Sequence, residues 1–164
     1  MKYTTTWVNE LQATTVAEKA HRQFGWVDDE AKSFILGNQE IFADKIEFNP
    51  PASNTIAMFP AFTTKGSLED WKEMTKFLNV EGQEPYQYVM GASFGSALMQ
   101  FMPVACSVLH LQSSDTGFGK TTAQFAGLSV WGDPKELILE KEDTYNTKMN
   151  RAEVYHNIPL FIDE

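Results

Sequence analysis

Hydrophobic and polar residues are first arranged at helical spacing and then in short runs typical of strands. From Thr6 to Gln23 a few apolar residues recur among polar ones in a weak helical pattern, and Gly25 is expected to end the helix. Four short apolar runs follow, separated by turn-forming Gly, Asn and Pro residues: Ser33–Leu36, Glu40–Ala43, Lys45–Phe48 and Thr55–Phe59. These runs predict a small antiparallel sheet.

A second helix is predicted after the sheet, and it begins at a capping box. Ser67 provides a capping hydroxyl, and Asp70 provides a carboxylate three residues later, which is the spacing that closes a helix N-terminus. One face of this helix carries Leu68, Trp71, Thr75 and Leu78. The polar break at 81–85 then closes an N-terminal α+β accessory unit, which we place at residues 1–83.

The remaining residues, 84–164, have the pattern of a parallel α/β fold. Tyr86–Phe101 is expected to be a helix whose small residues allow close packing. Val104–Leu111 is short, apolar and β-branched at two positions, which is typical of a strand buried on both faces. Further helices are predicted at Thr121–Trp131 and Tyr145–Tyr155, and further strands at Glu136–Leu139 and Ile158–Glu164. This β-α-β-α-β order favours a parallel sheet with right-handed crossovers.

One uncharged stretch has to be compared with a membrane span. The thirty residues between Glu84 and Asp115 contain no Asp, Glu, Lys or Arg. Polar residues interrupt the stretch, and Pro103 would break a spanning helix near its middle. We therefore favour a buried helix followed by a buried strand, and we expect no membrane partner.

The composition narrows the prediction to a folded, acidic protein. The 164 residues are 43% hydrophobic and 13% aromatic, which excludes a disordered tail and suits one domain with a small accessory unit. The net charge of -9 provides no basic surface for nucleic acid, so any DNA contact must be local or lie outside these residues. Cys106 and the three His residues lack metal-ligand spacing, and the N-terminus shows no targeting segment. We expect a cytoplasmic protein without a metal cluster.

The segment after the predicted strand 104–111 has the spacing of a phosphate-binding P-loop. Four motif positions match, namely Gly117, Gly119, Lys120 and Thr121, whereas Ser114 replaces the leading glycine. Glycines let successive backbone N–H groups face a phosphate, and the N-terminus of the following helix attracts the same anion. The predicted nucleotide-binding residues are Ser114, Asp115, Thr116, Gly117, Phe118, Gly119, Lys120, Thr121 and Thr122.

ATP and Mg²⁺ are the ligands that this motif favours. Lys120 is expected to act in catalysis by neutralising the β- and γ-phosphates, and Thr121 to offer a hydroxyl to Mg²⁺. Asp163, 43 residues after Lys120, is expected to bind the same Mg²⁺, and Glu164 to activate the attacking water as general base. An acidic pair alone is usually a solvated turn, but the phosphate motif favours a metal site. Arg151 is expected to be an exposed residue on a helix face, which we favour, or to contact the nucleotide.

Five segments carry a resemblance to a known group of proteins. They are Gly66–Trp71, Ser113–Thr122, Ser129–Pro134, Thr144–Thr147 and Asn157–Glu164. Together they resemble the helicase domain of primase-helicase proteins from phages and integrated elements, a group catalogued as a domain of unknown function. The resemblance covers the chain from about residue 66 and implies a P-loop NTPase, similar to superfamily-three helicases. It implies ATP hydrolysis in a homo-oligomeric ring that separates DNA strands during replication.

Other functions stay open because later elements of that family cannot be placed in this sequence. In the family a sensor residue, DNA-contacting loops and an arginine finger follow the position of Glu164, so we expect a fragment that binds nucleotide without motor activity. The alternatives are another P-loop enzyme, such as a nucleotide or small-molecule kinase, and a nucleotide-binding module without catalysis. The adjacent Asp163 and Glu164 suit activation of water better than activation of a substrate hydroxyl, which favours the helicase ATPase.

Overall fold

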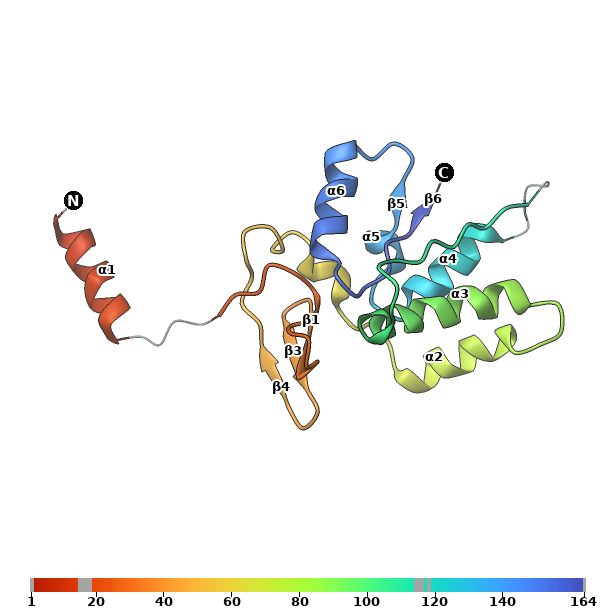
Figure 1. Ribbon diagram of the computed structural model, residues 1–164, viewed down its shortest axis with the longest axis horizontal. Coiled ribbons are helices and arrows are strands. Elements are labelled where there is room, and N and C mark those ends of the chain that lie inside the picture. The colour runs from red at the N-terminus through yellow and green to blue at the C-terminus, as the bar shows by residue number, and fades with distance from the viewer. Residues whose placement is uncertain (1, 15–18, 114–116, 118, 164) are drawn as a thin grey trace.

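The structure is a computed structural model, and it describes residues 2–14, 19–113, 117 and 119–163. In Figure 1 one helix stands apart at the N-terminus, and the remaining chain forms a small antiparallel sheet, several helices and a short parallel strand pair. The protein is therefore mixed α/β, as the sequence predicts at this coarse level. None of the helices in the described ranges has the length and hydropathy needed to span a bilayer.

The separate helix is α1 (Lys2–Thr14), and its side chains from Tyr3 onward are exposed. The prediction of a helix over Thr6–Gln23 is wrong about both ends, because α1 begins earlier and residues 19–23 are not helical. The side chains of α1 are exposed from Tyr3 onward, and a helix without a packed face is stabilised only weakly. Gly25 ends no helix and instead begins a strand.

The antiparallel sheet confirms three of the four predicted strands. Its strands are β1 (Gly25–Trp26), β2 (Ser33–Leu36), β3 (Gln39–Phe42) and β4 (Ile46–Phe48), paired in that order. The pairing of Leu36 with Gln39 leaves a two-residue loop between β2 and β3. Gly37, the first loop residue, has φ +55°, which is the left-handed conformation that a tight hairpin requires. The local turn chemistry therefore determines this hairpin.

The fourth predicted strand, Thr55–Phe59, is not a strand. Residues 53–58 form turns, followed by the 3₁₀-helix η1 (Phe59–Phe62). Thr55 is fully buried, and its Oγ1 accepts a hydrogen bond of 3.1 Å from the backbone N–H of Ala52. Such a local bond competes with strand pairing, and Pro60 favours the start of the 3₁₀-helix.

The capping box is confirmed at the start of α2 (Leu68–Thr75). The backbone N–H of Asp70 donates to Ser67 Oγ at 3.1 Å. The helix continues as the 3₁₀-helix η2 (Lys76–Leu78), in which Leu78 is buried. Among the residues predicted to share one face of this helix, Leu68 is exposed, with 58% of its surface accessible to solvent.

Two helices that support the candidate site pack along each other. They are α3 (Glu84–Gly95), which continues as the 3₁₀-helix η3 (Ser96–Phe101), and α4 (Lys120–Leu128). A Cβ added at Gly127 would lie 2.8 Å from Phe161 Cζ and 3.1 Å from Val89 Cγ1, so only glycine fits this approach. Of the small residues predicted to allow close packing on the 86–101 helix, Ser93 is buried, whereas nothing lies within 4 Å of a Cβ added at Gly91 or Gly95. The prediction is therefore wrong for these two glycines.

The prediction of a buried strand at Val104–Leu111 is wrong. The described structure gives this segment no strand pairing, and most of it is exposed, including 89% of Val108. A strand buried on both faces needs neighbouring strands and a layer on each face, whereas the parallel sheet described here has two strands only. The strand that carries Asp163 therefore pairs with another element.

That element is β5 (Leu139–Glu140), which pairs in parallel with β6 (Ile162–Asp163). The helix α6 (Tyr145–Val154) connects them, as predicted, so one β-α-β unit of the expected succession is present. Half of the predicted strand Glu136–Leu139 belongs instead to the short helix α5 (Pro134–Leu137). Proline at the first helical position and a capping side chain just before it favour this helix.

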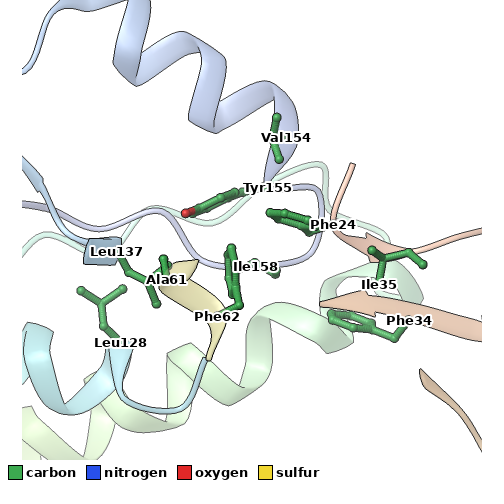
Figure 2. Close-up of a cluster of buried hydrophobic side chains, with 10 residues drawn as sticks. All are labelled: Phe24, Phe34, Ile35, Ala61, Phe62, Leu128, Leu137, Val154, Tyr155 and Ile158. Carbon is green, nitrogen blue, oxygen red and sulfur yellow. The ribbon is translucent and has the colours of Figure 1, made fainter. Parts of the chain in front are cut away.

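The core joins segments that are distant in the sequence. Figure 2 shows ten buried side chains of this cluster: Phe24, Phe34, Ile35, Ala61, Phe62, Leu128, Leu137, Val154, Tyr155 and Ile158. The rings of Phe24 and Phe62 meet edge to face with centroids 4.7 Å apart. Phe24 N–H also donates to the Val154 carbonyl at 2.8 Å. Residues from 1–83 and from 84–164 both contribute to this cluster. The division into an accessory unit and an α/β unit at these bounds stays a prediction.

Candidate nucleotide site

The candidate site begins at the turn before α4, where two glycines adopt left-handed backbone conformations. Gly117 has φ +87° and Gly119 has φ +68°, values that residues with a side chain rarely adopt. Lys120 is the first residue of α4, and the residue at the N-cap position, Gly119, has no side chain to cap the helix. The first amides of a helix have no partner within the helix and carry partial positive charge, which attracts anions. The start of α4 therefore offers backbone donors where the sequence predicts the phosphates.

Part of the predicted site lies outside the described residues. This part consists of Ser114, Asp115, Thr116, Phe118 and Glu164, and their roles stay predictions. Lys120 is half-buried, and Thr122 lies exposed in the first turn of α4. Within the described part of the chain, no carboxylate lies at ion-pair distance from Lys120.

Thr121 and Asp163, which the sequence places 42 residues apart, meet in the structure. Thr121 Oγ1 donates a hydrogen bond of 3.0 Å to Asp163 Oδ2. Thr121 is in the first turn of α4, and Asp163 ends β6 in the parallel strand pair. The two predicted metal ligands thus lie together at one end of β6.

A second hydrogen bond joins the same two elements and was not anticipated from the sequence. Gln124 lies one helical turn after Thr121, and its Nε2 donates to the Ile162 carbonyl at 3.0 Å. Its Oε1 is buried and has no hydrogen-bond partner among the described residues. The only sequence signal for this contact is the i, i+3 spacing of two polar residues on α4. Together the two bonds fix α4 against β6.

A cleft of about 1060 Å³ opens beside these residues. Its walls come from α3, from the extended segment 105–111 and from residues 156–163, and Lys120, Gln124 and Asp163 all line it. Known small-molecule sites are clefts of roughly 300–1,000 Å³ with a few polar groups on mainly apolar walls. The cleft therefore has the size and the lining of a site for a ligand as large as a nucleotide.

The oxygen atoms of Thr121 and Asp163 fit Mg²⁺. Neighbouring ligands of an octahedral Mg²⁺ at 2.0–2.1 Å lie about 2.9 Å from each other, which follows from the right angle between them. Thr121 Oγ1 and Asp163 Oδ2 are 3.0 Å apart, a distance that suits both their hydrogen bond and two neighbouring ligands of Mg²⁺. No group of three or more His, Cys, Asp or Glu side chains suited to a metal occurs among the described residues. A Mg²⁺ ion here would take its other ligands from water and phosphate.

Arg151 lies on α6, where it is half-buried and hydrogen-bonded to backbone carbonyls rather than simply exposed. Its Nη1 donates to the carbonyls of Glu136 and Leu137 at 2.8 and 3.0 Å. These carbonyls belong to the end of α5, where backbone acceptors lack helical partners. Arg151 therefore connects α6 to the C-terminus of α5 and has a structural role.

The fold and the site together define a mixed α/β protein with a glycine turn, a helix N-terminus and an adjacent carboxylate. The chain belongs to the family described as domain of unknown function (DUF927), which it matches over residues 2–164. No curated protein and no solved structure matches it significantly.

Proposed function

We propose that this chain is the ATP-binding part of a DNA helicase of the primase-helicase type. The observation that carries the proposal is the hydrogen bond between Thr121 and Asp163 beside the left-handed turn at Gly117 and Gly119. These residues belong to two motifs that are far apart in the sequence, and a Mg²⁺-nucleotide site needs both motifs together. The resemblance to phage and mobile-element helicases provides the reaction class.

In the proposed site each residue has a separate task. The backbone amides at the start of α4 hold phosphate oxygens, and the Lys120 ammonium group neutralises the β- and γ-phosphates. Thr121 and Asp163 hold Mg²⁺, which when bound draws charge from the phosphates and orients them. Glu164, next to Asp163 in the sequence, accepts the proton of the attacking water.

The proposed fold at the finer level is a P-loop NTPase core. Support comes from the order of elements, because a glycine turn leads into α4 and a parallel β5–α6–β6 unit ends at Asp163. The proposed partners are ATP, Mg²⁺ and DNA, and the proposed assembly is a homo-oligomeric ring in the cytoplasm. The proposed activity of such a helicase is ATP hydrolysis coupled to strand separation.

Titration with MgATP tests the proposal directly. Isothermal titration calorimetry should detect MgATP binding to the wild-type chain, and Lys120→Ala should weaken the affinity by roughly tenfold or more, since a charge on the phosphates is lost. Lys72→Ala is the matched control, because Lys72 is an exposed lysine on α2. Equal MgATP affinities for Lys120→Ala and the wild-type chain would show that the phosphate-site assignment is wrong.

A second measurement separates a helicase from a kinase. A helicase ATPase should hydrolyse ATP faster when single-stranded DNA is added. Transfer of the γ-phosphate to a small-molecule hydroxyl instead of water would support the kinase alternative. Binding of MgATP without either reaction would support a nucleotide-binding module.

A further inference from the structure

Tyr86 occupies the space beside Gly119 that a side chain would need. A Cβ added at Gly119 would overlap the Tyr86 hydroxyl oxygen and would lie 3.1 Å from Tyr86 Cζ. Gly119 also has φ +68°, which favours glycine, and a larger residue here would in addition have to displace the end of the Tyr86 side chain. No motif in the sequence connects these two residues, because Tyr86 belongs to α3 and precedes the glycine turn by more than thirty positions.

The position of Tyr86 is fixed by the packing of α3 on α4. Tyr86 is half-buried in the first turn of α3, where its backbone N–H donates to the Gln83 carbonyl at 3.0 Å. Further along α3, Ser93 is fully buried, and its Oγ donates to the Gly127 carbonyl at 2.6 Å. Helix α3 is therefore held at one end by a buried hydrogen bond to α4, and its other end places Tyr86 against the turn.

We propose that Tyr86 is a positioning residue for the phosphate-binding turn and acts through Gly119. The Gly119 carbonyl accepts the N–H of Ala123 at 2.9 Å, which is the first helical hydrogen bond of α4. The position of the Gly119 backbone thus determines where α4 begins and in which direction its first amides point. Tyr86, which belongs to α3, lies against Gly119 and limits its movement. The ligand in this inference is MgATP, so this part rests on the proposed function.

The first experiment needs no ligand. Amide hydrogen exchange of the unliganded chain should be faster at Ala123 in Tyr86→Ala than in the wild type, because the turn loses its support. Tyr145→Ala is the matched control, since Tyr145 is 74% exposed on α6. Exchange at Ala123 that is the same in Tyr86→Ala and the control overturns the inference, whether or not the chain binds nucleotide.

The second experiment measures MgATP affinity in a double-mutant cycle. Gly119→Ala and Tyr86→Ala should each weaken binding by roughly tenfold, since a displacement of about 1 Å in such a site has a large effect. The double variant should bind at least as tightly as Gly119→Ala, because removal of the ring relieves the overlap. Losses that multiply in the double variant indicate two independent structural roles and overturn the inference.

The two failures can be distinguished. If the wild-type chain binds no MgATP, the proposed function fails, while the exchange measurement still decides the role of Tyr86. If binding depends on Lys120 but the cycle shows no coupling, the proposed function stands and the role of Tyr86 fails. Tyr86→Phe adds a check, since it keeps the ring but removes the hydroxyl that lies nearest to Gly119, and it should recover only part of the affinity lost in Tyr86→Ala.

Discussion

The Ser93 hydroxyl donates a hydrogen bond of 2.6 Å to the carbonyl oxygen of Gly127, and both residues are buried where α3 crosses α4. The indole Nε1 of Trp131 also lies 3.1 Å from Ser93 Oγ, so the buried hydroxyl has two partners. A satisfied polar group in a buried interface fixes the register of the two helices. This register determines how the start of α4 lies relative to α3.

Gly127→Ala should destabilise the fold. The added methyl would lie 2.8 Å from Phe161 Cζ, and overpacking of a core costs about 1–3 kcal/mol of unfolding free energy. Urea unfolding followed by circular dichroism measures the change. Gly91→Ala is the matched control on α3, where nothing lies within 4 Å of the new Cβ, and it should stabilise the helix by about 0.5–1 kcal/mol. Equal stabilities of the two variants would contradict the packing described for α4.

Asp163→Asn should reduce MgATP binding and leave the fold in place. The substitution keeps an oxygen near Thr121 but removes the negative charge, so Mg²⁺-dependent affinity should fall by roughly tenfold or more. The loss should be smaller for ATP titrated in the presence of a chelator. Glu140→Gln is the control, because Glu140 is the exposed partner of Asp163 in the β5–β6 register. An equal loss in both variants would argue for a general electrostatic effect.

Several parts of the fold could be predicted because their cause is local in the sequence. Ser67 and Asp70 form their capping box within one helical turn, and Gly37 supports the β2–β3 hairpin with its own backbone conformation. The helix α6 likewise begins at its capping residue, where Thr147 N–H donates to Thr144 Oγ1. In each case the residues that decide the structure are close neighbours.

The wrong predictions concern apolar runs whose structure depends on distant partners. Val104–Leu111 has a strand-like pattern, but the described structure provides no neighbouring strand for it. The run Thr55–Phe59 forms turns and the first residue of η1. Phe62 of η1 packs into the core against Phe24. Short apolar runs do not distinguish a buried strand from another buried element, because periodicity alone carries no information about pairing.

The candidate site was predictable only where a motif carries it. Lys120, Thr121 and Asp163 follow from motif spacing, and the structure brings Thr121 and Asp163 together. Gln124 and Tyr86 belong to no motif, since their contacts depend on how α4 lies against β6 and α3. Contacts of this kind follow from tertiary packing and leave only a weak trace in the sequence.

Asp133→Ala should destabilise the C-terminal part of the chain. The Asp133 carboxylate forms an ion pair with Lys65 and accepts the Lys135 N–H at 3.1 Å as the cap of α5. Loss of an N-cap costs about 1 kcal/mol of unfolding free energy. Thermal unfolding should show the loss, and Asp44→Ala, at an exposed position between β3 and β4, should change stability by less than about 0.5 kcal/mol.

The contribution of Asp133 should also depend on pH. The Lys65 side chain and then the Lys135 backbone N–H lower the pKa of Asp133 below its usual value. A carboxyl group with a lowered folded-state pKa stabilises the fold above its unfolded-state pKa and loses this effect as the pH falls through the folded-state value. The stabilities of the wild type and Asp133→Ala should therefore converge in acid. A constant difference down to pH 2 would contradict the ion pair.

His21 should make the fold less stable in mildly acidic solution. Burial lowers the pKa of His21 below 6.5, and this effect exceeds the opposite effect of Glu40, whose Oε2 lies 3.6 Å from His21 Nε2. The neutral form is thus favoured in the fold, so stability is fully present above the unfolded-state pKa and decreases as the pH falls through the folded-state value. Urea unfolding at pH 7.5 and at pH 5 measures the loss. His21→Gln should remove much of the difference between the two pH values, because glutamine does not titrate. If His21→Gln kept the full wild-type difference, burial of the imidazole would not be its cause.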